Sequence, residues 1–186
     1  KWDYSDPVNG QSLPAPFFYD PEIFEQEKTH IFMNCWHLVG HVNEFKEPGS
    51  YIVQDVFEQS VVITTEKDGD IYAWHNVCRH RGNRLMNDRR GKVNCMLRCP
   101  YHSWYYSLNG DLRAAPRTEH LDSFSKKDHS LRKVRLEIFA GWVFITLDDN
   151  AQPISEMMVG AEPEMRKFLP DMDNVELVEE TDVIVN

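Results

Sequence analysis

The sequence lacks any uninterrupted apolar run that approaches the roughly 18 residues of a membrane-spanning helix. It also shows no cleavable secretory leader, because its first residues, KWDYSDPVNGQSLPAP, are polar and proline-rich where a leader would be apolar. No internal repeat and no low-complexity tract are present. With 186 residues, the chain is long enough to build one sizeable core without disulfide bridges. We therefore expect a cytoplasmic protein with no membrane association.

Cysteine is scarce, with four residues in the chain. Four cysteines could form two disulfides in a secreted protein, but three of them fall between residues 78 and 99, and two of these are interleaved with histidines. This arrangement fits metal binding in a reducing compartment better than a disulfide framework.

Positive charge is scarce as well, since 20 Lys and Arg residues oppose 30 Asp and Glu residues and leave a net charge of −10. This balance argues against a nucleic-acid-binding protein, which would need a basic field. Seven basic residues nevertheless gather in one segment with a single acid, Asp88, and form a basic island: Arg79, Arg81, Arg84, Arg89, Arg90, Lys92 and Arg98. The island is either a docking surface for a negatively charged partner or a set of arginines paired with neighbouring carboxylates. The sequence leaves both interpretations open.

The residue patterns predict a mainly antiparallel β fold with helices near both ends, α+β overall. Residues 20–34 predict a helix, because Asp20 can cap it and Pro21 suits its first turn. Residues 153–169 predict a second helical segment with an interruption at 160–163.

Short runs rich in β-branched and aromatic residues predict the strands, at 51–57, 60–66, 70–77, 92–97 and 140–147. Hairpin turns are expected at KDGD (67–70) and LNGDL (108–112). A further strand is predicted over residues 174–186.

One stretch of the chain places a cysteine beside a histidine twice. One residue separates Cys78 from His80, and two residues separate Cys99 from His102. A single zinc ion would accept two thiolates and two imidazoles, but each segment here offers one ligand of each kind, which suits two different metal positions. A [2Fe–2S] cluster with two thiolates on one iron and two imidazoles on the other is such a site. A zinc-binding interaction module remains the alternative.

The segments CRHRG (78–82) and CPYHSW (99–104) resemble the Rieske iron–sulfur motif, C-x-H followed by C-x-x-H. The resemblance implies that the chain carries a Rieske [2Fe–2S] cluster, and that its metal ligands are Cys78, His80, Cys99 and His102.

The neighbours of these four residues also fit the resemblance. Gly82 would let the backbone approach the inorganic sulfides, Pro100 would stiffen the second segment, and Trp104 would cover a flank of the cluster. Ser103 departs from the glycine most often found at its position. It either lends a hydroxyl near the cluster or is a small residue that fits.

The resemblance is to the low-potential kind of Rieske protein. High-potential members carry a further cysteine in each ligand segment, joined as a disulfide, whereas this chain has Asn83 and Tyr101 there. We expect Cys35 and Cys95 to be buried as small apolar residues. A potential near the lower end of the Rieske range, roughly −150 mV, is implied.

The long flanks of the motif resemble the large (alpha) subunit of Rieske non-haem iron oxygenases of the aromatic-ring-hydroxylating type. LPAPFFYDPEIFEQEKTHIFMNCWHLVGHV is similar to their lead-in of an arm, a helix and a Trp-containing strand. We expect an arm and helix over residues 1–35, the Rieske domain over 36–150, and a helix and strand over 151–186 that lead into a catalytic domain absent from this chain. A stand-alone Rieske-type ferredoxin is the alternative.

In this family two histidines and a carboxylate hold a mononuclear Fe(II) where O₂ reacts. The family's closely spaced histidine pair is not found in the sequence, where His120 and His129 are expected to be loop histidines. Structural roles are expected for His37, His41 and His75. The chain should therefore be the electron-transfer part of an oxidoreductase and should not hydroxylate a substrate alone.

The resemblance also implies partners and a route for electrons. A reductase or ferredoxin would pass electrons derived from NAD(P)H to the cluster, and His102 would be the electron exit toward the mononuclear iron of an adjacent subunit. The full-length subunit would form a homotrimer or an alpha–beta hexamer. Its reaction would be O₂-dependent hydroxylation or demethylation of a small organic substrate, with an aromatic acid, an aromatic hydrocarbon and a quaternary amine all open.

Overall fold

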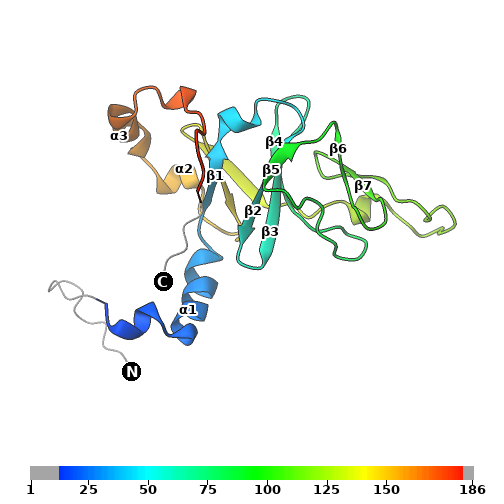
Figure 1. Ribbon diagram of the computed structural model, residues 1–186, viewed down its shortest axis with the longest axis horizontal. Coiled ribbons are helices and arrows are strands. Elements are labelled where there is room, and N and C mark those ends of the chain that lie inside the picture. Colours follow the sequence, from blue (N-terminus) through cyan, green and yellow to red (C-terminus); the bar gives the residue numbers. More distant parts are fainter. Residues whose placement is uncertain (1–12, 182–186) are drawn as a thin grey trace.

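The computed structural model describes residues 13–181, in which ten short strands form three antiparallel sheets with helices near both ends (Figure 1). The mainly antiparallel β fold predicted from the sequence is confirmed. Part of the expected N-terminal arm (1–12) and the end of the predicted last strand (182–186) lie outside the described residues.

The largest sheet has four strands in the order β4-β3-β2-β5, with the bounds β2 Ser50–Val56, β3 Gln59–Thr65, β4 Ile71–His75 and β5 Arg90–Lys92. The apolar run Val61, Val62 and Ile63 in β3 is fully buried, as expected of a strand covered on both faces. The predicted turn at 67–70 is present, because Glu66 N–H donates to the Asp70 carbonyl at 2.9 Å.

The second sheet joins segments far apart in the sequence. Its order is β1-β10-β9, with the bounds β1 His37–His41, β9 Arg135–Phe139 and β10 Trp142–Thr146. Val39 of β1 and Val143 and Ile145 of β10 share one core with Ile63 of the first sheet. This core holds the two larger sheets together.

The third sheet is small and lies at the opposite end of the molecule from α3 (Figure 1). Its order is β6-β7-β8, with the bounds β6 Met96–Arg98, β7 Tyr105–Ser107 and β8 Leu112–Ala114. The Leu108 carbonyl accepts from the Thr64 hydroxyl at 2.7 Å and from the Trp74 indole N–H at 3.0 Å. These two bonds join the small sheet to the largest one. Gly110, with a φ of 80°, leaves room for the Trp74 ring, which a Cβ would meet at 2.7 Å.

Helices occupy the two ends of the described chain. The α-helices are α1 Pro21–Glu27, α2 Ile154–Met157 and α3 Ala161–Phe168, and α1 continues as the π-helical η2 Lys28–Phe32. Short 3₁₀ turns complete the set, η1 Ala15–Phe18, η3 Val42–Phe45, η4 Lys127–His129 and η5 Met172–Asn174. Asp20 caps α1 as predicted, accepting from Glu22 N–H at 2.9 Å. No helix among residues 13–181 is both long and apolar enough to cross a membrane.

Two strand predictions were wrong. The predicted strand 92–97 is divided between β5 and β6, because Val93 N–H donates to Gly49 and the chain then bends at Cys95 to reach another sheet. Residues 174–181 form no strand, since the Val175 carbonyl accepts from the Asn43 side chain and Glu180 pairs with arginines. At both places, contacts with distant parts of the chain replace the continuous hydrogen-bond ladder of the predicted strand.

Candidate metal centre

Two loops at the small-sheet end of the molecule carry the cysteine–histidine pairs, and both loops close in the same way. In the first loop, Cys78 N–H donates to the Asn83 carbonyl at 2.8 Å, and Gly82 N–H donates back to the Cys78 carbonyl at 3.0 Å. In the second, Cys99 N–H donates to Trp104 at 2.8 Å and Ser103 N–H donates to Cys99 at 3.1 Å. Each cysteine therefore begins a turn of equal length.

The fifth residue of each turn has a left-handed backbone. Gly82 has a φ of 68° and Ser103 a φ of 57°. Glycine adopts this conformation without strain, which explains why Ser103 is the less usual choice. The Ser103 hydroxyl accepts from the Arg98 guanidinium at 2.9 Å. The hydrogen-bond partner of the Ser103 hydroxyl is thus an exposed arginine and not a group inside the loop.

Hydrogen bonds brace the first loop in place of a disulfide. Asn76 is fully buried, donates to the Met86 carbonyl at 2.7 Å and to the Ser60 hydroxyl at 3.1 Å, and accepts from Met86 N–H at 2.9 Å. All four cysteines are free, as expected. The expectation that Cys95 is buried was wrong, because it lies exposed at the bend between β5 and β6, and Cys35 is only partly buried.

The two predicted cysteine ligands lie inside the protein. Cys78 and Cys99 are 2% and 1% exposed and belong to one core with Leu97, Trp104 and Tyr106. Burial raises the pKa of the Cys78 thiol, so a thiolate at this depth needs a compensating cation. Two buried, adjacent thiols with no disulfide between them are therefore suited to metal binding.

The Tyr106 hydroxyl lies beside the Cys78 sulfur at 3.3 Å. It accepts from Arg79 N–H at 3.0 Å, which leaves its own proton free to point at the sulfur. Burial raises the pKa of Tyr106 far above its ordinary value, so the hydroxyl remains a donor at any physiological pH. The sequence motif contains no sign of this contact.

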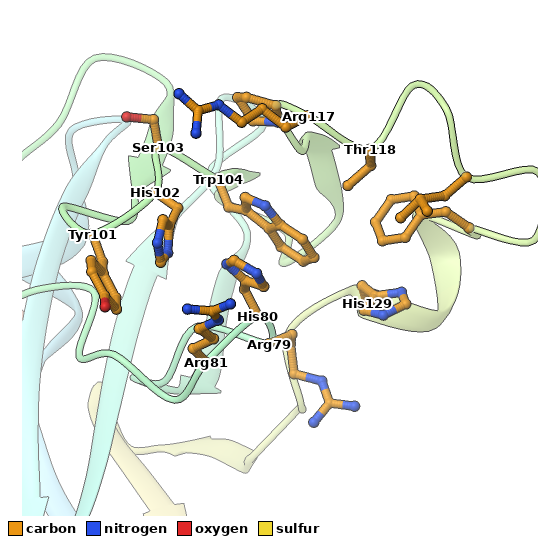
Figure 2. Close-up of a pocket in the computed structure, with 13 residues that line it drawn as sticks. Arg79, His80, Arg81, Tyr101, His102, Ser103, Trp104, Arg117, Thr118 and His129 are labelled. Atoms are coloured by element: carbon orange, nitrogen blue, oxygen red, sulfur yellow. The ribbon is translucent and has the colours of Figure 1, made fainter.

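The two predicted histidine ligands lie nearer the surface than the cysteines. The rings of His80 and His102 have centroids 4.7 Å apart, and His80 stacks on Trp104 at 4.8 Å and 8° (Figure 2). Tyr101 lies against His102 at 3.8 Å. Trp104 is 3% exposed and covers one face of the His80 ring.

This division of ligands has a chemical consequence. The sulfur pair is inside and the nitrogen pair outside, so the four groups form two pairs of different softness. Each loop supplies one thiol and one imidazole, with both thiols buried. The donor set therefore suits a binuclear group with thiolates on one metal and imidazoles on the other.

A hollow of about 690 Å³ opens beside the two imidazoles, and we call it the histidine hollow. It is lined by both predicted histidine ligands, by Trp104 and by the arginines Arg79, Arg81 and Arg117. His129 also lines it, contacting Phe124 at 4.6 Å and Trp104 at 5.7 Å. His129 was predicted to be only a loop histidine, and no local pattern indicates its place, because the 3₁₀ turn η4 brings it there from 27 residues beyond His102.

The remaining histidines have the structural surroundings expected of them. His41 is buried and its Nδ1 accepts from Asn43 N–H, and His37 Nε2 lies 2.6 Å from the Phe32 carbonyl. His75 is half-buried on β4, where burial, with Arg132 adding to it, lowers its pKa. His120 is exposed.

Most of the basic island is neutralised within the protein. Arg84 pairs with both oxygens of Asp55 at 3.0 Å, and Lys92 pairs with Glu47 at 2.6 Å. Further pairs join Arg90 to Glu44, and both Arg89 and Arg90 to Glu180. Arg79 and Arg81 form no ion pair with any described residue, and neither does Arg117. The pairing interpretation thus holds for Arg84, Arg89, Arg90 and Lys92, and the docking interpretation stays a prediction for the rest.

The chain is similar to known proteins over most of its described length. The family of Rieske [2Fe-2S] domains matches residues 35–125. The oxygenase subunit of carnitine monooxygenase from Acinetobacter baumannii is 35% identical over 156 residues, 84% of this chain and 42% of that protein. The oxygenase subunit of glycine betaine monooxygenase from Pseudomonas aeruginosa is 34% identical over 172 residues, 92% of this chain and 39% of that protein.

A solved structure gives the same result. The crystal structure of the quaternary ammonium Rieske monooxygenase CntA with L-carnitine superposes with a TM-score of 0.83 at 33% identity. The match covers 89% of this chain and 47% of that one. The chain thus spans less than half the length of the relatives that it matches.

Proposed function

Because the chain belongs to the Rieske non-haem iron oxygenases and contains their [2Fe–2S] domain, we propose that it relays electrons to an oxygen-activating iron site. In this proposal Cys78 and Cys99 would bind one iron of the cluster, and His80 and His102 would bind the other. A bound [2Fe–2S] cluster supplies storage for one electron. The single observation that carries the proposal is the pairing of buried thiols with outer imidazoles on two loops of equal geometry.

The residues of the chain have separate tasks in this relay. The buried thiols anchor the group, and the Tyr106 hydroxyl donates to the Cys78 sulfur. His102 reaches the histidine hollow and is proposed as the electron exit. Trp104 and Tyr101 pack on the two imidazoles and restrict their orientation, so the exit geometry is preorganised.

The acceptor in the proposal is a mononuclear iron outside residues 13–181, where no set of two histidines and a carboxylate converges. We place it in an adjacent subunit of a trimer, with a reductase or ferredoxin as the electron source. The oxygenase relatives favour this assignment over a stand-alone ferredoxin. A cytoplasmic location belongs to the same proposal.

We propose a quaternary amine as the substrate of the whole enzyme, with hydroxylation or oxidative demethylation as the reaction. The support is that the carnitine and glycine betaine monooxygenase subunits are similar over most of this chain. An aromatic substrate is the competing possibility, since aromatic-ring dioxygenases share the same cluster domain.

Removal of one ligand tests the cluster assignment. Cys99→Ser should abolish the visible absorption and the labile sulfide of the purified protein, whereas Cys95→Ser should keep both, because Cys95 is exposed and precedes β6, outside both ligand loops. Iron and acid-labile sulfide are measured together with the absorption spectrum before and after dithionite. A colourless protein that binds zinc would contradict the proposal.

A further inference from the structure

The first ligand loop has a second hollow on another side, and we call it the cysteine hollow. It measures about 380 Å³ and is lined by Cys78, Val77, Gly82, His75, Arg79 and Arg132, but by neither predicted histidine ligand. The histidine hollow, in contrast, is lined by both imidazoles and by neither cysteine. The metal centre can therefore be approached from two sides that differ in chemistry.

Only a thin layer of protein covers the Cys78 side of the site. Cys78 itself is 2% exposed, but its neighbour Val77 is 40% exposed. Gly82 is exposed and carries no side chain, and a Cβ built there would meet nothing within 4 Å. A redox partner resting on this surface would therefore lie close to the thiolate-bound metal.

The cysteine hollow is positively charged, although the whole chain is negatively charged. The chain has a net charge of −10, yet Arg79 and Arg132 line this hollow and no acidic side chain does. Neither arginine forms an ion pair with a described residue, whereas Arg84 of the same loop region is held by Asp55. Figure 2 shows the Arg79 guanidinium directed away from the His80 ring. Such an unneutralised patch attracts an acidic surface and increases its association rate.

We propose that the cysteine hollow is the docking site of an acidic electron-carrier protein, so that electrons arrive on the Cys78 side and leave on the His102 side. This inference rests on the proposed function, because it assumes that the histidine hollow faces the acceptor. Separate surfaces allow donor and acceptor to be bound at the same time. In each transfer the reduced carrier loses one electron and the cluster of this chain gains it, and no covalent bond forms or breaks.

Charge reversal at matched arginines tests the proposal. Arg132 lines only the cysteine hollow and Arg117 only the histidine hollow, and both are exposed and outside the ligand loops. The probe is an acidic plant-type [2Fe–2S] ferredoxin, and the full chain is used with its cluster loaded. Binding of the oxidised ferredoxin is followed by NMR line broadening or calorimetry at low salt, so this readout needs no electron transfer.

Arg132→Glu should raise the Kd for the ferredoxin about tenfold and reduce its salt dependence, while Arg117→Glu should change it less than twofold. The rate at which photochemically reduced ferredoxin reduces the cluster should follow the same order. Arg132→Gln removes the charge without reversing it and should raise the Kd by a smaller factor. Agreement between the two variants would show that the effect of Arg132→Glu does not come from a folding defect. Equal effects at both positions, or a larger effect at Arg117, would overturn the proposal.

The cluster assignment and the docking site can be disproved separately. The visible spectrum and the reduction of the cluster by dithionite should be the same in both variants and the parent protein. If no cluster is present in any of them, the proposed function fails. If the cluster is present and the ferredoxin binds without regard to Arg132, only the docking site fails.

Discussion

At the scale of single residues, the Tyr106 hydroxyl is placed to change the electron affinity of the metal centre. It donates to the Cys78 sulfur at 3.3 Å, and a hydrogen bond to sulfur stabilises the reduced, more negative form of a cluster. Tyr106→Phe should therefore lower the reduction potential, by about 40 mV if the bond contributes about 1 kcal/mol. Redox titration measures this. Tyr105→Phe is the control, because the Tyr105 ring lies against Arg98, whereas the hydroxyl beside the Cys78 sulfur is that of Tyr106.

Because Ser103 has a left-handed backbone, its replacement by glycine should stabilise the folded protein. Ser103→Gly should raise the free energy of unfolding by about 1 kcal/mol, since glycine relieves the strain at a φ of 57°. Ser103→Val should lower the free energy, because a branched Cβ is poorly tolerated in this conformation. Denaturant unfolding compares both variants with Ser123→Gly, an exposed loop residue with an ordinary φ. A Gly variant no more stable than the parent protein would contradict the prediction.

Replacement of Asn76, which lies beside the first loop, should lower the free energy of unfolding. Asn76→Leu removes three hydrogen bonds and leaves the Met86 N–H without its acceptor, so the free energy of unfolding should fall by about 2–4 kcal/mol. The cluster should also bleach faster in air, because the loop that begins two residues later is less firmly held. The time course of visible absorption measures this, with the exposed Asn94→Leu as control. Equal bleaching rates would show that Asn76 does not brace the loop.

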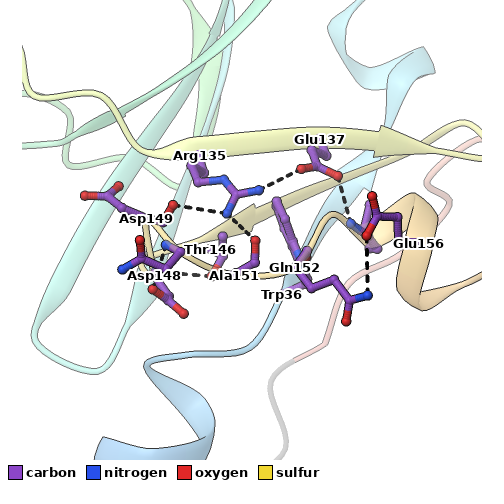
Figure 3. A network of polar contacts seen from close by, with 11 residues as sticks. Trp36, Arg135, Glu137, Thr146, Asp148, Asp149, Ala151, Gln152 and Glu156 are labelled. Carbon is purple, nitrogen blue, oxygen red and sulfur yellow. Dashed lines mark hydrogen bonds and ion pairs between the residues drawn. The ribbon is translucent and has the colours of Figure 1, made fainter.

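At the scale of elements, a polar network connects β9 to the helical C-terminal part (Figure 3). Pro153 precedes α2 and has no side chain that can cap it. Glu137 of β9 supplies the missing acceptor, since it accepts from Ile154 N–H at 2.8 Å and from Arg135 at 3.0 Å. The Arg135 guanidinium lies 5.2 Å from the Trp36 ring and donates to the Asp149 carbonyl. One arginine–glutamate pair thus holds three segments together.

Removal of the Glu137 carboxylate from this network should cause a local loss of order. Glu137→Leu should increase amide hydrogen exchange in α2, because Ile154 N–H loses its acceptor and the helix start is no longer capped. The total loss of stability should be about 1–3 kcal/mol. Hydrogen exchange followed by mass spectrometry measures it, with Glu156→Leu as control, because the Glu156 side chain is exposed and accepts only from Gln152, at 3.4 Å, among the described residues. Unchanged exchange in α2 would exclude this capping role.

At the scale of the whole molecule, the described chain has two cores, and the largest sheet contributes residues to both. One core contains Cys78 and Cys99 with Trp104 and Tyr106, and the other joins β3 to β10 through Ile63 and Val143. Both predicted cysteine ligands lie in the first core and none lies in the second. The two cores should therefore respond differently when the metal is removed.

Iron chelation tests this division. The chelated protein should melt at a lower temperature, because binding energy that stabilises only the folded state is lost. Amide protection should fall over residues 78–106 and persist in β1 and β10, whose buried residues belong only to the core without a predicted ligand. Hydrogen exchange of loaded and chelated protein measures this. A uniform loss of protection would show that the two cores form a single cooperative unit.

The sequence by itself determined what depends on local spacing. The turn at 67–70, the cap at Asp20 and the strand at 60–66 were predicted from neighbouring residues, as were the four candidate ligands, which stay a prediction. In each case the chemistry is decided within a few positions along the chain. The short β-rich runs indicated the fold class, and the family resemblance added the cofactor.

Only the tertiary structure decided which distant segments meet. It paired β1 with β10, brought His129 against Trp104, divided 92–97 between two sheets and matched Arg90 with Glu44. These contacts depend on how the cores pack and where charges become neighbours, and no local pattern encodes that. The charge that remains unpaired around the two hollows is a result of the same packing, which is why the island of arginines could not be interpreted from its sequence alone.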